Sequence, residues 1–140
     1  MKTAMAAMLF LCISTSAEAK PFHDSMPMAF QGTWAPSLAA CKDRVGVDKF
    51  TIDSESVNYY EGNDYLLIGI EFSGAMTKRG EWGSLFNGRF TSRLETALMN
   101  ENNIRMEVAE KAPDVLYRYP IGEDGEPIAT REVRSFRCKN

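Results

Sequence analysis

Ile104-Arg105-Met106-Glu107-Val108 is the clearest strand pattern in the chain, because apolar and charged residues alternate without a break. Successive side chains of a β-strand point to opposite faces, so Ile104, Met106 and Val108 would share one buried face. Other short segments rich in β-branched and aromatic residues lie on both sides, separated by turn residues. No segment between them has a helix-length period. The sequence therefore predicts an all-β domain.

Eight or nine short strands are expected, joined mostly by tight turns. They fall at residues 30–35, 49–53, 57–61, 64–72, 81–86, 89–99, 104–108, 115–119 and 128–138. This order predicts an antiparallel meander, folded as a small barrel or as a two-sheet sandwich. Ser37 is a good N-cap, so one short helical turn is expected after the first strand.

Asn87-Gly88 is the strongest hairpin motif, since both residues accept the positive φ of a type I′ turn. The following segment, 89–99, is ambiguous, because its apolar spacing fits both a strand and one face of a helix. The turn motif before it favours a strand. Further connections are expected at 100–103 and, as a polar loop bounded by glycines, at 73–80.

The first nineteen residues have the pattern of a secretory signal peptide. Lys2 precedes the apolar run Ala4–Ile13, and Ala17-Glu18-Ala19 is a small-x-small cleavage site. The apolar run is too short to span a bilayer. We therefore expect a signal peptide at 1–19, a flexible leader at 20–29 and a single β domain at 30–140. The protein would be periplasmic or secreted.

Two of the three cysteines, Cys41 and Cys138, lie outside the signal peptide. In an oxidising compartment such a pair predicts one disulfide, which would hold the two ends of the meander together and favour a closed barrel. The alternatives are two free buried thiols and, for Cys12, a lipid-anchor site. Leu11 is too bulky for the residue before a lipidated cysteine.

Composition excludes several classes of function. The formal net charge is −3, which does not fit a general nucleic-acid binder, and no apolar run outside the signal is long enough for a membrane span. The single histidine, His23, lies in the leader, and no glycine-rich phosphate loop precedes a helix. The acidic turn at 123–126 lacks the ligand spacing of a calcium loop. We expect no catalytic residues, metal or cofactor.

The aromatic residues are the most informative side chains for function, because they are expected either to fill the barrel interior or to line a cavity for a small apolar ligand. They are Trp34, Tyr59, Tyr60, Tyr65, Phe72, Trp82, Phe86, Phe90, Tyr117 and Tyr119.

Two short motifs resemble known families of barrel. Phe-x-Gly-x-Trp at Phe30–Trp34 resembles the Gly-x-Trp opening of lipocalins, which implies that Arg134 or Arg137 lies over the Trp34 ring. Ser73-Gly74-Ala75, followed by Lys78, is similar to the loop with which bacterial inhibitors plug the cleft of c-type lysozyme. The outline of the whole chain resembles small, uncharacterised exported proteins of Gram-negative bacteria.

Together these features favour a non-enzymatic binding module for a protein partner or a small apolar ligand. One alternative is an inhibitor of c-type lysozyme, which would use Ser73, Gly74, Lys78 and Arg79 as its contact loop. The other is a carboxylate-based hydrolase.

Overall fold

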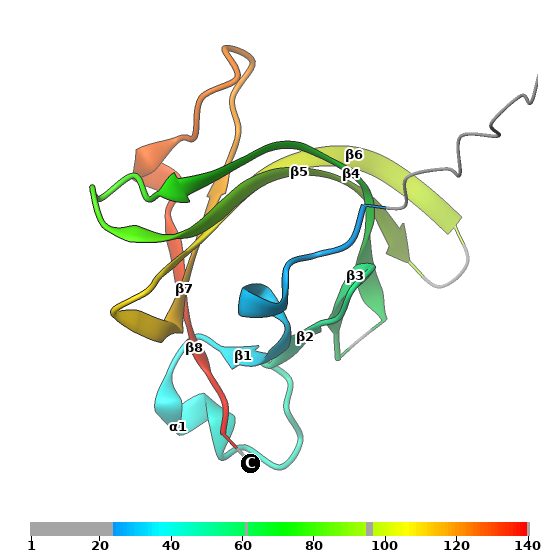
Figure 1. Ribbon diagram of the computed structural model, residues 1–140. Coiled ribbons are helices and arrows are strands. Elements are labelled where there is room, and N and C mark those ends of the chain that lie inside the picture. The colour runs from blue at the N-terminus through cyan, green and yellow to red at the C-terminus, as the bar shows by residue number, and fades with distance from the viewer. Residues whose placement is uncertain (1–23, 61, 95–96, 140) are drawn as a thin grey trace, which may run out of the picture.

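The computed structural model describes residues 24–60, 62–94 and 97–139, and within them the chain forms a closed antiparallel barrel of eight strands in meander order (Figure 1). This confirms the all-β barrel prediction. The strands are β1 (Gly32–Ala35), β2 (Phe50–Ile52), β3 (Ser56–Tyr59), β4 (Asn63–Met76), β5 (Trp82–Leu94), β6 (Ala97–Ala109), β7 (Ala112–Pro120) and β8 (Val133–Arg137). Short helical turns are η1 (Met28–Phe30), α1 (Leu38–Cys41) and η2 (Ala129–Arg131).

The alternating segment lies in the middle of β6, and its apolar face is the inner one. Met106 and Val108 are buried in the core cluster, and Ile104 packs against that cluster. The side chains between them, Arg105 and Glu107, face the outside of the barrel, next to the outer residues of β5 and β7. The period-two pattern therefore predicted correctly which side of this strand is buried.

The hairpin predicted at Asn87-Gly88 is wrong, because both residues lie in the middle of β5 and pair with Arg105 and Ile104 of β6. Gly88 sits there for a packing reason: a Cβ at this position would lie 2.6 Å from the ring of Phe90 and 2.9 Å from that of Phe86. Both rings are fully buried and flank Gly88 on the inner face. The glycine serves a close approach inside the sheet, not a turn.

The connection between β5 and β6 falls between Leu94 and Ala97 instead. The ambiguous segment 89–99 is therefore strand on both sides of this connection, as favoured by the sequence. The turn expected at 100–103 is also wrong, since these residues belong to β6, and residues 101–103 pair with β5. The three strands β4, β5 and β6 are thus longer than predicted, and they form the arched part of the wall in Figure 1.

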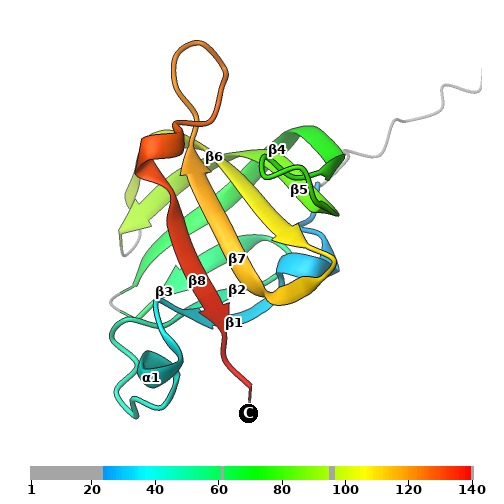
Figure 2. The ribbon, with the colours of Figure 1, turned by 90° about the vertical axis from the view of Figure 1, so that its left-hand side faces the viewer.

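The first and last strands close the barrel, with Trp34 paired to Arg137 and Ala35 to Phe136. The predicted disulfide between Cys41 and Cys138 is confirmed, with 5.3 Å between the two Cα atoms. It joins α1 to the end of β8, at the bottom of the barrel in Figure 2. Ser37 caps α1 as expected, because its side chain accepts a hydrogen bond from the Ala40 N–H at 3.0 Å.

Residues 24–29 are packed against the barrel, which corrects the expectation of a flexible leader for this part of 20–29. Met26 is buried in the core, and its N–H donates to the Ser54 carbonyl at 2.8 Å. The Asp24 carboxylate accepts a hydrogen bond from the Ile70 N–H of β4 at 2.7 Å. The predicted signal peptide, the rest of the leader and His23 lie outside the described residues.

One end of the barrel is closed by η1 and the side chains around it. The Trp34 indole N–H donates to the Phe30 carbonyl at 2.8 Å, and both side chains are fully buried. The Arg137 guanidinium lies 4.2 Å from the centre of the Trp34 ring. The lipocalin resemblance implied this contact for Arg134 or Arg137; the structure shows it for Arg137, whereas Arg134 lies over Phe136. In Figure 1, η1 appears inside the ring of strands.

Candidate functional site

A cavity of about 440 Å³ opens at the other end of the barrel. On β6 it is lined by residues 101–104 and by Met106, whereas residues 108–109 of the same strand lie at the end near Ala29 of η1. On β7 it is lined by residues 118–120, followed by Ile121 after the strand, and Pro113 of β7 lies at the η1 end. The complete lining is Val57, Tyr59, Tyr65, Glu101, Asn102, Asn103, Ile104, Met106, Arg118, Tyr119, Pro120, Ile121 and Val133.

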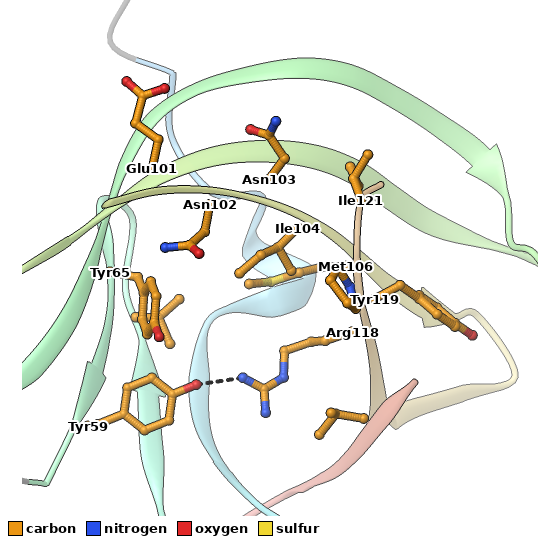
Figure 3. A pocket seen from close by; sticks show the side chains of 13 residues that line it. Tyr59, Tyr65, Glu101, Asn102, Asn103, Ile104, Met106, Arg118, Tyr119 and Ile121 are labelled. Carbon is orange, nitrogen blue, oxygen red and sulfur yellow. Dashed lines mark hydrogen bonds between the residues drawn. The ribbon is translucent and has the colours of Figure 1, made fainter. Parts of the chain in front are cut away.

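Arg118 is the central polar group of this cavity. Its Nη1 donates a hydrogen bond to the Tyr59 hydroxyl at 2.6 Å, which Figure 3 shows as the dashed line. Its guanidinium carbon lies 4.3 Å from the centre of the buried Phe50 ring, so one face of the cation rests on the apolar core. The side chain is half-buried, and its Nε has no hydrogen-bond partner in the part of the chain that the structure describes.

Aromatic and aliphatic side chains form the walls around Arg118. The Tyr59 ring stacks on Phe50 with 5.3 Å between ring centres and meets Tyr65 edge-on at 5.8 Å. Ile104 and Met106 of β6 lie across the cavity from the tyrosines in Figure 3. Such rings offer apolar faces and one hydroxyl each, which suits a ligand with a flat or aliphatic body.

The outer rim of the cavity is polar. Glu101, Asn102 and Asn103 follow one another at this end of β6, and Glu101 is exposed. Figure 3 places Glu101 at the far side of the cavity from Arg118. The two charged residues of the lining thus sit at opposite ends, with the apolar walls between them.

The aromatic residues named from the sequence include all three tyrosines of the cavity, but Arg118 was missed. The period of the strand could have predicted the position of Arg118, because Leu116 and Arg118 share one face of β7 and Leu116 is fully buried. The ten aromatic residues proposed for the interior divide into three groups. Tyr59, Tyr65 and Tyr119 line the cavity, Trp34, Phe86 and Phe90 fill the core, and Tyr60, Phe72, Trp82 and Tyr117 lie outside both.

The predicted contact loop 73–80 is shorter than expected. Ser73 and Gly74 belong to β4, where they pair with Phe86 and Leu85 of β5. Only the four residues from Thr77 to Gly80 form a turn, in which the Gly80 N–H donates to the Thr77 carbonyl at 2.9 Å. Of the four residues predicted for the contact loop, Lys78 and Arg79 therefore lie in the turn, whereas Ser73 and Gly74 lie in β4.

This turn is fastened to the outer face of the barrel. The Lys78 N–H donates to both carboxylate oxygens of Glu107, at 2.9 and 3.1 Å. Arg79 donates to Glu132 at 2.7 Å and lies 4.4 Å from the centre of the Tyr117 ring. Arg79 is thus already engaged within the chain. Inhibition of c-type lysozyme through this loop stays a prediction.

Glu107 is the most deeply buried carboxylate in the described part of the chain, with 1% of its surface exposed. Burial raises the pKa of the Glu107 carboxyl above its usual value, against the lowering effect of the Lys78 N–H. Nearby, the Tyr119 hydroxyl donates to Glu132 at 2.6 Å. These acids hold the outer turn in place, and neither lines the cavity. A carboxylate-based hydrolase stays a prediction.

No protein-family model, curated protein or solved structure matches this chain. The resemblances to lipocalins and to lysozyme inhibitors therefore rest on short motifs and on a barrel fold that many unrelated families use.

The remaining predicted features can be placed within residues 24–60, 62–94 and 97–139. The acidic turn is there, with the Asp124 carboxylate accepting from the Glu126 N–H at 3.1 Å. This part of the chain contains no group of three or more histidine, cysteine or acidic side chains placed to hold a metal ion. It also contains no helix with the length and hydropathy of a membrane span.

Proposed function

We propose that this protein binds a small molecule with an apolar body in the open end of its barrel. The observation that carries the proposal is the cavity of about 440 Å³ between Tyr59, Tyr65, Ile104 and Met106. Ligand sites typically measure about 300–1,000 Å³ and combine apolar walls with a few fixed polar groups. This cavity has both properties.

The rest of the barrel supports a pre-formed site. The η1 end of the barrel is filled by buried side chains such as Phe30 and Trp34, so the barrel interior is packed with side chains between this end and the cavity. The walls come from β3, β4, β6 and β7, which are held by antiparallel ladders. A site built on strands needs little reorganisation on binding, which lowers the entropic cost of ordering it. The confirmed disulfide fits the oxidising compartment proposed for the protein.

The test is titration with N-phenyl-1-naphthylamine, an uncharged dye whose emission rises in apolar surroundings. Emission should rise and saturate with the wild type. Asn102→Trp should block binding, because Asn102 is half-buried and lines the cavity. Asn100→Trp is the matched control, since Asn100 is exposed on the same strand and does not line it.

Dye emission is a better measure of binding than tryptophan emission, because neither Trp34 nor Trp82 lines the cavity. Absence of saturable binding, or equal binding by the two tryptophan variants, would refute a ligand site at this end of the barrel.

A further inference from the structure

We propose that the natural ligand carries an anionic head group, which binds Arg118 and the Tyr59 hydroxyl at the base of the cavity. This inference rests on the proposed ligand-binding function and adds to it the chemical class of the ligand. It predicts a small amphiphile with one negative charge, held with its head toward the core and its apolar body along the cavity walls.

The first argument is that Arg118 is a half-buried cation without an acidic partner. Within the described residues, three arginines have a buried Nε with no hydrogen-bond partner. Arg89 and Arg93 have a carboxylate nearby, Glu71 at 3.9 Å and Asp64 at 3.0 Å. No carboxylate of the described residues lies within ion-pair distance of Arg118. Charges are seldom removed from water unless they are paired, so an anion from outside would complete this site.

The second argument is the set of donors at the base. The Tyr59 hydroxyl accepts a hydrogen bond from Arg118, and its own proton has no acceptor among the described residues. A guanidinium carries five N–H donors in a fork that fits carboxylate geometry, and only one of them is used here, on Tyr59. The hydrogen-bonding capacity left at Arg118 and Tyr59 is therefore mostly that of donors, which suits an anion.

The third argument is the direction of the electrostatic field along the cavity. Arg118 lies at the core end, against the Phe50 ring, and Glu101 lies at the exposed rim. An anion would gain from moving toward Arg118 and away from Glu101, whereas a cation would be held at the rim. The partly desolvated base strengthens the interaction relative to one in water. An anionic head thus belongs at the base and an apolar tail at the mouth.

The experiment compares ligands with the same tail and different heads by isothermal titration calorimetry. Octanoate and octyl sulfate should bind the wild type about tenfold or more tightly than 1-octanol, the ratio that about 1.4 kcal/mol of charge-assisted hydrogen bonding produces. Octylammonium should bind more weakly than 1-octanol. Equal affinity for octanoate and 1-octanol would overturn the anionic head group and leave the ligand-binding function standing. Failure of every octyl compound and of the dye would overturn both.

Three variants separate recognition of the head from a structural role of Arg118. Arg118→Met should remove the preference for octanoate over 1-octanol, and Arg118→Lys should retain it. Tyr59→Phe should weaken octanoate binding by about fivefold, as expected for one neutral hydrogen bond. Arg131→Met is the control, because it removes the same charge from an exposed position outside the cavity. A preference that survives Arg118→Met in a folded protein would contradict the assignment.

Discussion

Arg137→Met should be among the most destabilising surface-accessible substitutions in this protein. The Arg137 side chain is 23% exposed and holds the closed end of the barrel together. It donates to the Gln31 carbonyl at 2.6 Å and to the Ala29 carbonyl at 2.8 Å, while its guanidinium covers the Trp34 ring. Methionine would keep much of the apolar contact and lose the charge and every donor.

The expected loss can be worked out from these contacts. A hydrogen bond from a charged donor contributes about 1.5–3 kcal/mol, and a cation–π contact about 0.5–2 kcal/mol. The ion pair with Asp114 is half-exposed and adds little. Because neighbouring contributions are not additive, we expect the free energy of unfolding to fall by about 3–4 kcal/mol. The melting temperature should drop by about 10 °C or more for a domain of this size.

The matched control is Arg134→Met on the same strand. Arg134 is exposed and points to the other face, where its guanidinium lies 5.5 Å from the centre of the Phe136 ring. Its replacement should cost about 0.5 kcal/mol or less. Urea unfolding of the oxidised protein, followed by tryptophan emission, to which buried Trp34 contributes, and by far-UV circular dichroism, measures both losses. Equal losses for the two variants would refute the role given to Arg137.

Three further predictions concern other parts of the fold. Replacing both disulfide cysteines by serine opens a cross-link of sequence separation 97 and should lower the free energy of unfolding by about 2–5 kcal/mol; an unchanged urea midpoint would contradict this. Gly88→Ala should cost about 1–3 kcal/mol by forcing the buried rings of Phe86 and Phe90 apart, and unaltered stability would show that the rings can move. The pKa of the Glu107 carboxyl is raised above 4.5, the ordinary pKa of a glutamate side chain, so the wild type should lose stability as pH rises above 4.5 and the buried carboxyl has to ionise. Glu107→Gln has no carboxyl at this position and should therefore become more stable relative to the wild type over the same pH range. Unfolding curves at several pH values would show the opposite slope, or none, if the Glu107 charge were well solvated.

The barrel could be predicted because its main determinants are local. Ile104, Met106 and Val108 alternate with polar residues, and this period alone identifies the buried face. The pairing of Cys41 with Cys138 followed from having two cysteines outside the predicted signal peptide. The position of these cysteines near the two ends of the meander favoured a closed barrel over a two-sheet sandwich, and the structure shows the closed barrel.

The errors have a common physical cause, which is tertiary packing that overrides a local motif. Asn87-Gly88 has the composition of a turn, but Phe86 and Phe90 require the small residue between them. Met26 lies in a segment of turn-like composition, and its burial depends on core residues distant in sequence.

Arg118 was missed for a related reason. A charged residue in a strand is ordinarily assigned to the solvent face. Nothing in its own neighbourhood says that Tyr59, 59 residues away, will meet it inside the barrel.

Pairing of the first strand with the last means that the barrel can close only after the end of β8 has been synthesised. Cys41 cannot form its disulfide until Cys138 has been synthesised. At a translation rate of about 5–20 residues per second, the separation of 97 residues corresponds to a delay of about 5–20 seconds. Until β8 arrives, β1 and β7 are both open edges, and open edges are sites of aggregation. The interval before β8 pairs with β1 is therefore the stage of folding at which both edges are exposed to other chains.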